Sequence, residues 1–232
     1  MRTVCTMGAI LGVVLGCVAA AQAQDTGSLS GRITFAGTPP PKKKIEATKD
    51  QDVCGKNNNL YDESLVVGPD KGLQNAVVMI MGAKGGKFAS QKATLDQKGC
   101  QYVPHVVVVP ATGELEILNS DGVLHNIHTH SSANPEINVA QPKFKKVLTE
   151  KFPKTEIIKA TCDAHGWMNA WIVSTDNPFV AVTDDKGNFT IKDLPPGKYT
   201  VEIWQETLGK QTKEVNIKAK EDTKLTVEMA KK

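Results

Sequence analysis

Apolar and polar residues alternate near both ends of the chain, as expected of strands that cover a core with one face. Residues 25–36 place Leu29, Ile33 and Phe35 at even spacing, which puts them on one side of an extended chain. Residues 73–80 are almost continuously apolar and predict a second strand. Further short strands are predicted at residues 179–183, 188–191, 194–201, 215–217 and 225–227.

Turn and breaker residues separate these segments. Pro39–Pro41 end the first strand, residues 82–86 are rich in glycine, and Asp184-Asp185-Lys186-Gly187 forms a turn signal between two later strands. Long segments with helical periodicity are few. The chain is therefore predicted to be all-β, built from β-sandwich units.

A cluster of soft ligands interrupts the strand pattern at residues 162–168. Cys162, His165 and Met168 are spaced at i, i+3 and i+6, just before an apolar stretch at 169–173. A regular strand would send Cys162 and His165 to opposite faces, so a shared site requires a loop here. Sulfur ligands together with imidazole select copper, and a type 1 site also needs a second histidine. His125 supplies it after an upstream strand and turn.

Residues 92–175 resemble the cupredoxins, and the spacing of the ligand loop is more like that of amicyanin than that of plastocyanin. The motifs that carry this resemblance are Tyr102-x-Pro104, the strand Glu116-Ile117-Leu118-Asn119, the pair His125-Asn126 and the Cys162–Met168 loop. The resemblance implies a Greek-key β-sandwich with one type 1 copper.

The resemblance also implies roles for individual residues. His125, Cys162 and His165 would be the equatorial copper ligands, with Met168 as the axial ligand, and Asn126 would join the two ligand loops by hydrogen bonds. Electrons would pass through an exposed edge of His165, beside which Trp167 would contact the partner; alternatively, Trp167 packs between two domains.

These features favour a single-electron carrier over an enzyme. Four protein ligands leave no position for a substrate, and no acid–base pair or phosphate-binding loop stands nearby in the sequence. The expected partner is a redox protein bound transiently, such as a c-type cytochrome or a dehydrogenase. The alternatives are a copper-binding or copper-delivery protein and a surface binding module.

Three histidines remain outside this ligand set. His105 lies in an apolar stretch and is expected to be a core or surface residue with its hydrogen bonds satisfied. His128 and His130 are two residues apart on one predicted strand and share a face. They could bind a second metal, but solvent exposure is the simpler expectation.

Residues 179–229 resemble the later strands of carboxypeptidase regulatory-like (transthyretin-like) domains. The motifs are Thr183-Asp184-x-x-Gly187-x-Phe189 and Leu194-Pro195-x-Gly197-x-Tyr199. The opening strands of such a domain match residues before the cupredoxin-like part. We therefore expect residues 28–82 and 177–230 to form one sandwich, with the cupredoxin-like domain (92–175) inserted between its strands. The alternative is a separate C-terminal sandwich packed beside the cupredoxin-like domain.

The first 24 residues are predicted to be an export signal. Arg2 is their only charge, an apolar stretch follows, and Ala21-Gln22-Ala23 fits a cleavage site. A periplasmic or secreted protein follows from this; anchoring as a lipoprotein at Cys17 is the less favoured alternative. No other segment is long and apolar enough to be expected to cross a membrane.

Charge excludes nucleic acid as an expected partner. The full chain has a formal charge of +3 (28 − 25), and removal of the signal with Arg2 leaves +2 (27 − 25). The lysines at 42–44 and between 143 and 154 are expected to be solvated loops.

Without the signal the chain keeps three cysteines, Cys54, Cys100 and Cys162, and three single pairings are possible. If Cys162 is the metal thiolate that the cupredoxin resemblance implies, Cys54 and Cys100 remain to form one disulfide. The alternative is two buried free thiols.

Overall fold

The computed structural model describes residues 25–231. The expected export signal at residues 1–24, including Cys17, lies outside the described residues. Nearly all of the regular structure is β, so the predicted fold class is correct. Within residues 25–231, no helix has the length and apolar character needed to span a bilayer.

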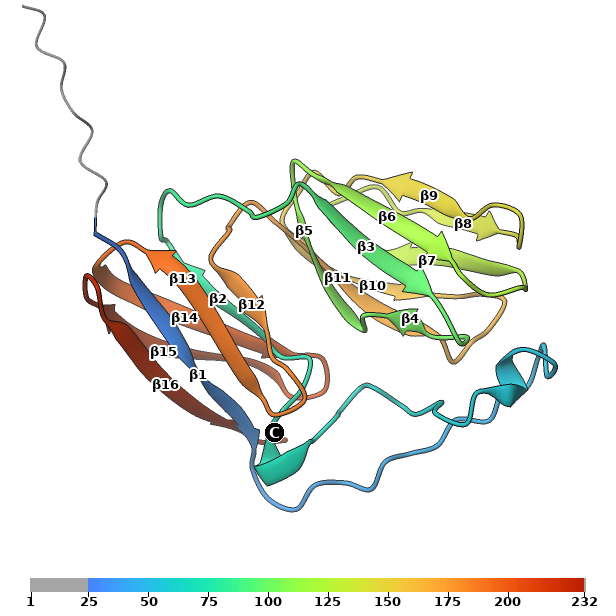
Figure 1. Ribbon diagram of the computed structural model, residues 1–232, viewed down its shortest axis with the longest axis horizontal. Helices are drawn as coiled ribbons and strands as arrows, with labels where there is room; N and C mark the ends of the chain where they lie inside the picture. The colour runs from blue at the N-terminus through green and yellow to red at the C-terminus, as the bar shows by residue number, and fades with distance from the viewer. Residues whose placement is uncertain (1–24, 232) are drawn as a thin grey trace, which may run out of the picture.

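One sandwich is built from the two ends of the described chain; we call it the outer sandwich (Figure 1). Its two sheets have the strand orders β13-β1-β16 and β12-β2-β14-β15. Its strands are β1 (Gly27–Phe35), β2 (Val77–Met81), β12 (Val180–Val182), β13 (Asn188–Leu194), β14 (Gly197–Gln205), β15 (Gly209–Ile217) and β16 (Asp222–Met229).

The second sandwich, the inner sandwich, occupies the chain between β2 and β12. Its sheets have the orders β5-β11-β10-β7-β8 and β4-β3-β6-β9. Its strands are β3 (Lys92–Gln97), β4 (Tyr102–Val103), β5 (Val106–Pro110), β6 (Glu114–Asn119), β7 (His125–His130), β8 (Asn138–Gln141), β9 (Val147–Glu150), β10 (Glu156–Thr161) and β11 (Asn169–Thr175). Because β1 and β2 pair only with strands that follow β11, the inner sandwich is nested within the outer one.

The continuous apolar character of β2 has a structural cause. Val78 and Ile80 point into the core of the outer sandwich, while Val77 and Met79 face the inner sandwich. There they join Val106, Val173 and further apolar side chains of β5 and β11. Both faces of β2 are therefore buried, and a strand buried on both faces reads as an apolar run.

The same interface holds a pair of tryptophans. Trp171 of the inner sandwich and Trp204 of the outer sandwich meet edge to face, with ring centroids 5.0 Å apart. Such a pair contributes about 0.5–1.5 kcal/mol beyond its buried area. The two sandwiches thus share an apolar contact in addition to the two chain segments that join β2 to β3 and β11 to β12.

A long polar segment leaves β1 and returns before β2. We call residues 38–64 of this segment the strap. Its two arms pair as an antiparallel ribbon, with a bridge between Lys44 and Tyr61 and a hydrogen bond of 3.0 Å from the amide of Ile45 to the carbonyl of Leu60. Its tip contains the short 3-10 helix η1 (Cys54–Lys56), and a second one, η2 (Pro69–Lys71), follows the strap. Figure 1 shows the strap running from the outer sandwich to the far end of the inner one.

The turn between β12 and β13 depends on a glycine. Gly187 has a φ of +77° and closes the turn by donating its amide hydrogen to the carbonyl of Asp184 at 2.9 Å. A Cβ at this position would lie 2.2 Å from the carbonyl oxygen of Ile33 in β1. The Asp-Asp-Lys-Gly turn signal thus reflects both the backbone conformation and the close approach of β1.

Candidate metal centre

Two loops at one end of the inner sandwich bring the predicted ligands together. Strands β7 and β10 pair antiparallel, with His128 opposite Thr161, so the start of β7 lies beside the end of β10. His125 is the first residue of β7, and Cys162 directly follows β10. The strand pairing therefore places the residues 125 and 162 next to each other.

The segment from Cys162 to Met168 is a tight loop, as a shared site requires. The amide of Met168 donates to the carbonyl of His165 at 2.9 Å, and the amide of Cys162 donates to the carbonyl of Met168 at 3.2 Å. These bonds turn the imidazole of His165 back over Cys162. The Nδ1 atom of His165 lies 3.8 Å from the Sγ atom of Cys162 and 3.0 Å from the Nδ1 atom of His125.

The side chains of His125, Cys162 and His165 form a closed donor set. Their candidate ligand atoms all lie within 4.8 Å of one another, and all three residues are buried. Met168 is also buried and belongs to the core cluster that contains Cys162. One sulfur and two imidazole nitrogens, sheltered from water, fit copper far better than magnesium or calcium.

Each imidazole is oriented by a carboxylate. Nε2 of His125 lies 2.9 Å from Oδ2 of Asp121, and Nε2 of His165 lies 2.8 Å from Oδ2 of Asp50. A carboxylate accepts hydrogen bonds, so the Nε2 atoms carry the hydrogens and donate. The two Nδ1 atoms lie 3.0 Å apart, and with both hydrogens on Nε2 they direct lone pairs at each other, an arrangement that calls for a metal ion or a proton between them.

Asn126 connects the two loops. Its backbone amide lies 3.4 Å from the Sγ atom of Cys162, and its side-chain oxygen accepts a hydrogen bond from the amide of Asp163. The hydroxyl of Tyr102 adds a third link, because it donates to the carbonyl of Asn126 and lies 3.1 Å from that of Thr161. The thiolate is thus held by bonds that do not depend on a metal.

The charges around the site shift its pKa values in opposite directions. Burial disfavours the Cys162 thiolate, but hydrogen bonds from His125 and from backbone amides outweigh it, and the pKa of the thiol is lowered. Burial also disfavours a charged His125; its hydrogen bonds to Asp121 and Cys162 prevail and raise its pKa to about 9. The pKa of His165 is lowered, chiefly by burial. The surroundings therefore favour both a positive charge on His125 and ionisation of the Cys162 thiol.

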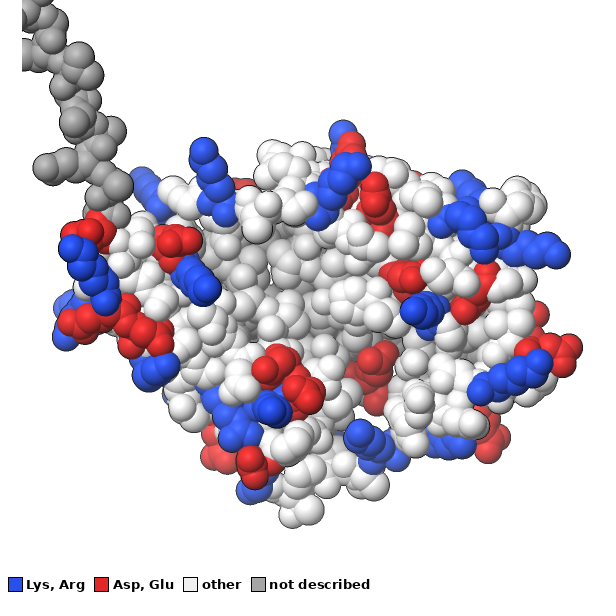
Figure 2. Space-filling model, in the orientation of Figure 1, with Lys and Arg blue, Asp and Glu red and all other residues white. Residues whose placement is uncertain are grey.

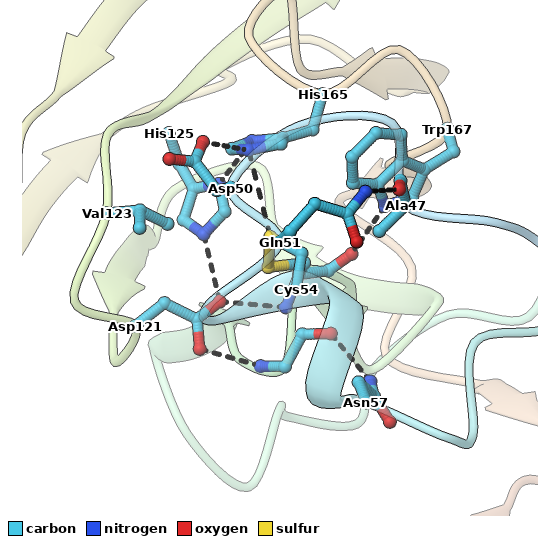
Figure 3. The surroundings of a disulfide bond; sticks show 12 residues. Ala47, Asp50, Gln51, Cys54, Asn57, Asp121, Val123, His125, His165 and Trp167 are labelled. Atoms are coloured by element: carbon cyan, nitrogen blue, oxygen red, sulfur yellow. Dashed lines mark hydrogen bonds and ion pairs between the residues drawn. A yellow bond between two sulfur atoms is a disulfide. The ribbon is translucent and has the colours of Figure 1, made fainter.

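The strap covers the C-terminal histidine, which contradicts one prediction. We expected the edge of His165 to reach the surface, but its side chain is 0% exposed. Figure 3 shows Asp50 and Cys54 of the strap against the imidazole, with the Sγ atom of Cys54 3.8 Å from Nε2. The prediction was wrong because the resemblance covered only residues 92–175, whereas the cover comes from the strap.

The disulfide between Cys54 and Cys100 is present and pins the tip of the strap to the inner sandwich. Cys162 is a buried free cysteine. Trp167 packs against the same region: its Nε1 donates to the carbonyl of Cys100 at 3.1 Å, and its ring meets that of His165 edge to face. Trp167 is half-buried and packs against the core of the inner sandwich, so it does not lie between the two sandwiches; its contact with a partner stays a prediction.

Asp50 and Asp121 were missed as functional residues. Asp121 lies four residues before His125, a spacing that could have drawn attention to it, and its carboxylate also accepts the amides of Gly99 and Cys100 at 2.8 Å. Asp50 lies 115 positions from His165 in a polar segment. Nothing in the local pattern around Asp50 indicates this contact.

The other histidines have different surroundings. His105 is buried between the sandwiches and its Nε2 pairs with Glu206. Its Nδ1 lies 3.8 Å from Glu63 and has no hydrogen-bond partner within residues 25–231, so the expectation that its hydrogen bonds are satisfied is wrong for this atom. His128 and His130 share one face, as expected, with ring centroids 4.5 Å apart. His128 is held between Asp163 and Glu136, at 3.0 Å from each.

Replacing His105 with alanine is expected to destabilise the protein by about 2–3 kcal/mol. The change leaves the largely buried carboxylate of Glu206 without its partner, and such losses exceed those of exposed pairs. Urea unfolding at pH 7 would measure it. The control is Lys92→Ala, which removes an exposed ion pair with Glu116 and should leave the midpoint unchanged. Equal midpoints for both variants would contradict this role of His105.

Comparisons with known proteins find both resemblances again. The family model for the carboxypeptidase regulatory-like domain matches residues 170–230. This match begins within β11, which belongs to the inner sandwich by its strand pairing. The match covers well under half of the chain, so it assigns this domain to residues 170–230 and not to the chain as a whole. No curated protein matches this chain.

The solved structures that match part of this chain include amicyanin, a purple cupredoxin and a copper-containing nitrite reductase. A methionine-to-alanine mutant of amicyanin in its Cu(I) form is 14% identical, with a TM-score of 0.33; the match covers 42% of this chain and 98% of amicyanin. A purple cupredoxin from Nitrosopumilus maritimus is 17% identical, with a TM-score of 0.31, over 36% of this chain and 98% of its own. A copper-containing nitrite reductase from Thermus scotoductus SA-01 is 20% identical, with a TM-score of 0.32, over 41% of this chain and 24% of its own. Because these matches have low identities and low TM-scores, they do not assign a metal to this chain, and the assignment depends on the geometry of the site.

Proposed function

We propose that this chain is an exported type 1 copper protein that carries single electrons between redox partners. The observation that carries the proposal is the convergence of two carboxylate-oriented Nδ1 atoms, 3.0 Å apart, beside the buried Cys162 thiol. In this proposal His125, Cys162 and His165 are the equatorial ligands of one copper, and Met168 is the axial ligand. Bound copper would supply one-electron chemistry by alternating between Cu(I) and Cu(II).

The residues around the proposed copper ligands support a role as an electron carrier because they hold the ligands in fixed positions. Asp121 and Asp50 hold a hydrogen on each Nε2 atom and thereby set the orientation of both rings. The amide of Asn126 holds the sulfur of Cys162. Ligands that cannot move suit both oxidation states, so electron exchange requires little rearrangement.

Burial favours a carrier over copper delivery or catalysis. The exposed fractions of His125, Cys162 and His165 are 0%, 1% and 0%. A delivery protein has to pass its metal to a ligand of the recipient, and an enzyme has to admit a substrate; buried ligands hinder both. We further propose that the partner is a periplasmic or extracellular redox protein, such as a c-type cytochrome or a dehydrogenase.

Copper loading followed by voltammetry tests this function. We expect one copper per chain, an intense visible band, and a reversible one-electron wave. A delivery protein would instead release Cu(I) to a competing chelator faster than it exchanges electrons with ferricyanide. Copper without the intense band, or an irreversible wave, would contradict the proposal.

A further inference from the structure

Because His165 is covered, a redox partner has to approach the metal centre from another side. The strap, the disulfide and Trp167 enclose His165, so a partner cannot approach the copper ligands closely from that side. The other imidazole, that of His125, is also buried, but it directly follows Leu124, whose side chain is 49% exposed. The surface beside His125 is therefore the candidate for contact with a partner.

Two loops form this surface as one unit. The side-chain amide of Asn119 donates to the carbonyl of Val123 at 3.0 Å and to that of Gln141 at 2.8 Å. The ammonium of Lys146 donates to the carbonyls of Asn119 and Asp121 at 3.2 and 3.3 Å. These bonds join the loop before His125 to the loop between β8 and β9.

The surface combines exposed apolar side chains with lysines. Phe144 at the β8–β9 loop is 81% exposed, the most exposed of the large apolar side chains in the described part of the chain. Figure 2 shows Lys and Arg side chains gathered at the end of the molecule where β8 and β9 meet. We call this surface the lysine face; its members are Leu124, Lys143, Phe144, Lys145, Lys146 and Val147.

Acidic side chains balance these lysines only in part: Glu150 of β9 lies close enough to Lys145 for the charge of the lysine to act on its carboxyl group. Residues 119–124 and 141–147 contain one acidic residue, Asp121, whose carboxylate is already engaged by His125 and by two amides. Glu116 pairs with Lys92 on the sheet, and Glu114 pairs with Lys151. The lysine face thus carries a positive charge around an apolar centre.

We propose that the lysine face is the docking site for an acidic redox protein, which exchanges electrons with the metal centre from the side of His125. This inference rests on the proposed function. Lysines around the contact attract an acidic partner and speed its association, and an exposed aromatic excludes water at the centre of a small, transient interface. Phe144 and its lysine neighbours provide both elements.

The test compares charge reversal on the lysine face with the same change elsewhere. The variant is Lys143→Glu with Lys145→Glu; the control is Lys218→Glu with Lys220→Glu on the outer sandwich, where the two side chains are 63% and 75% exposed. Both variants change the net charge equally. The probes are ferricyanide and an acidic c-type cytochrome, mixed with the reduced copper protein under stopped flow.

We expect oxidation of the lysine-face variant by both probes to be slower by on the order of 10-fold at low salt, whereas the control changes less than about 2-fold. Phe144→Ser should slow only the reaction with the cytochrome, with an unchanged salt dependence. Equal rates in the two charge variants would overturn the proposal. The proposal would also be overturned if the lysine face bound phosphatidylglycerol vesicles tightly while Phe144→Ser left the cytochrome reaction unchanged.

A second experiment tests the docking site independently of the proposed electron transfer. Hexacyanochromate(III) is an inert paramagnetic anion, and NMR line broadening shows where it binds on the protein without any electron transfer. Broadening centred on Leu124, Phe144 and Val147 would support the docking surface even if the copper proved redox-inactive. Broadening centred on the outer sandwich would overturn it.

Discussion

Cys162→Ser is expected to abolish the intense visible absorption of the copper-loaded protein and to leave the fold intact. The band arises from charge transfer between a thiolate and copper, and a hydroxyl is a hard ligand that cannot replace it. The fold is retained because the serine oxygen can still accept a hydrogen bond from the amide of Asn126. Copper titration followed by visible and far-ultraviolet spectra measures both effects.

The matched control for this variant is Met168→Leu. Met168 is the proposed axial ligand, which binds weakly, so the leucine variant should keep the intense band. Its reduction potential should rise because the cupric state loses an electron-donating thioether. A band that survives Cys162→Ser, or one that disappears in Met168→Leu with copper still bound, would contradict the ligand assignment.

Removing the disulfide with Cys54→Ala and Cys100→Ala is expected to produce the second large effect. The bond closes a loop with a sequence separation of 46, for which chain entropy predicts a loss of about 4 kcal/mol. The tip of the strap would also separate from His165, since the disulfide is its covalent attachment to the inner sandwich. Urea unfolding gives the first effect, and the rate of Cu(I) loss to a chelator gives the second.

Gln51→Ala serves as the control for the strap. The side-chain amide of Gln51 donates to the carbonyl of Ala47 within the strap itself, so its loss leaves the attachment to the inner sandwich in place. Copper retention should match that of the unchanged protein. If the disulfide variant also retained copper at the unchanged rate, the strap would not be what protects the site.

The all-β class and the grouping of the candidate ligands could be predicted because their signals are local. Leu29, Ile33 and Phe35 alternate along one strand, and Cys162, His165 and Met168 stand within seven residues. Antiparallel pairing of β7 with β10 then brings His125 to them, as a shared site demands. Such local patterns can be read from the sequence because strand geometry fixes the alternation of side chains and a short loop keeps its residues close together.

The surroundings of the ligands could not be predicted because they come from distant parts of the chain. Asp50 reaches His165 across 115 positions, and the strap that carries it has no apolar pattern. The lysines between 143 and 154 were expected to be ordinary solvated loops, since their sequence does not show that the β8–β9 loop lies beside the segment before His125. The apolar β2 likewise does not reveal which of its faces meets the other sandwich.

X-ray absorption at the copper edge is the most direct test of the proposed type 1 centre. We expect one short bond to sulfur and two bonds to imidazole nitrogen, with nearly the same distances in the oxidised and reduced protein. The short sulfur bond should be absent from copper-loaded Cys162→Ser. Copper bound by oxygen and nitrogen alone in the unchanged protein, or a large change in coordination on reduction, would contradict a type 1 centre formed by His125, Cys162 and His165.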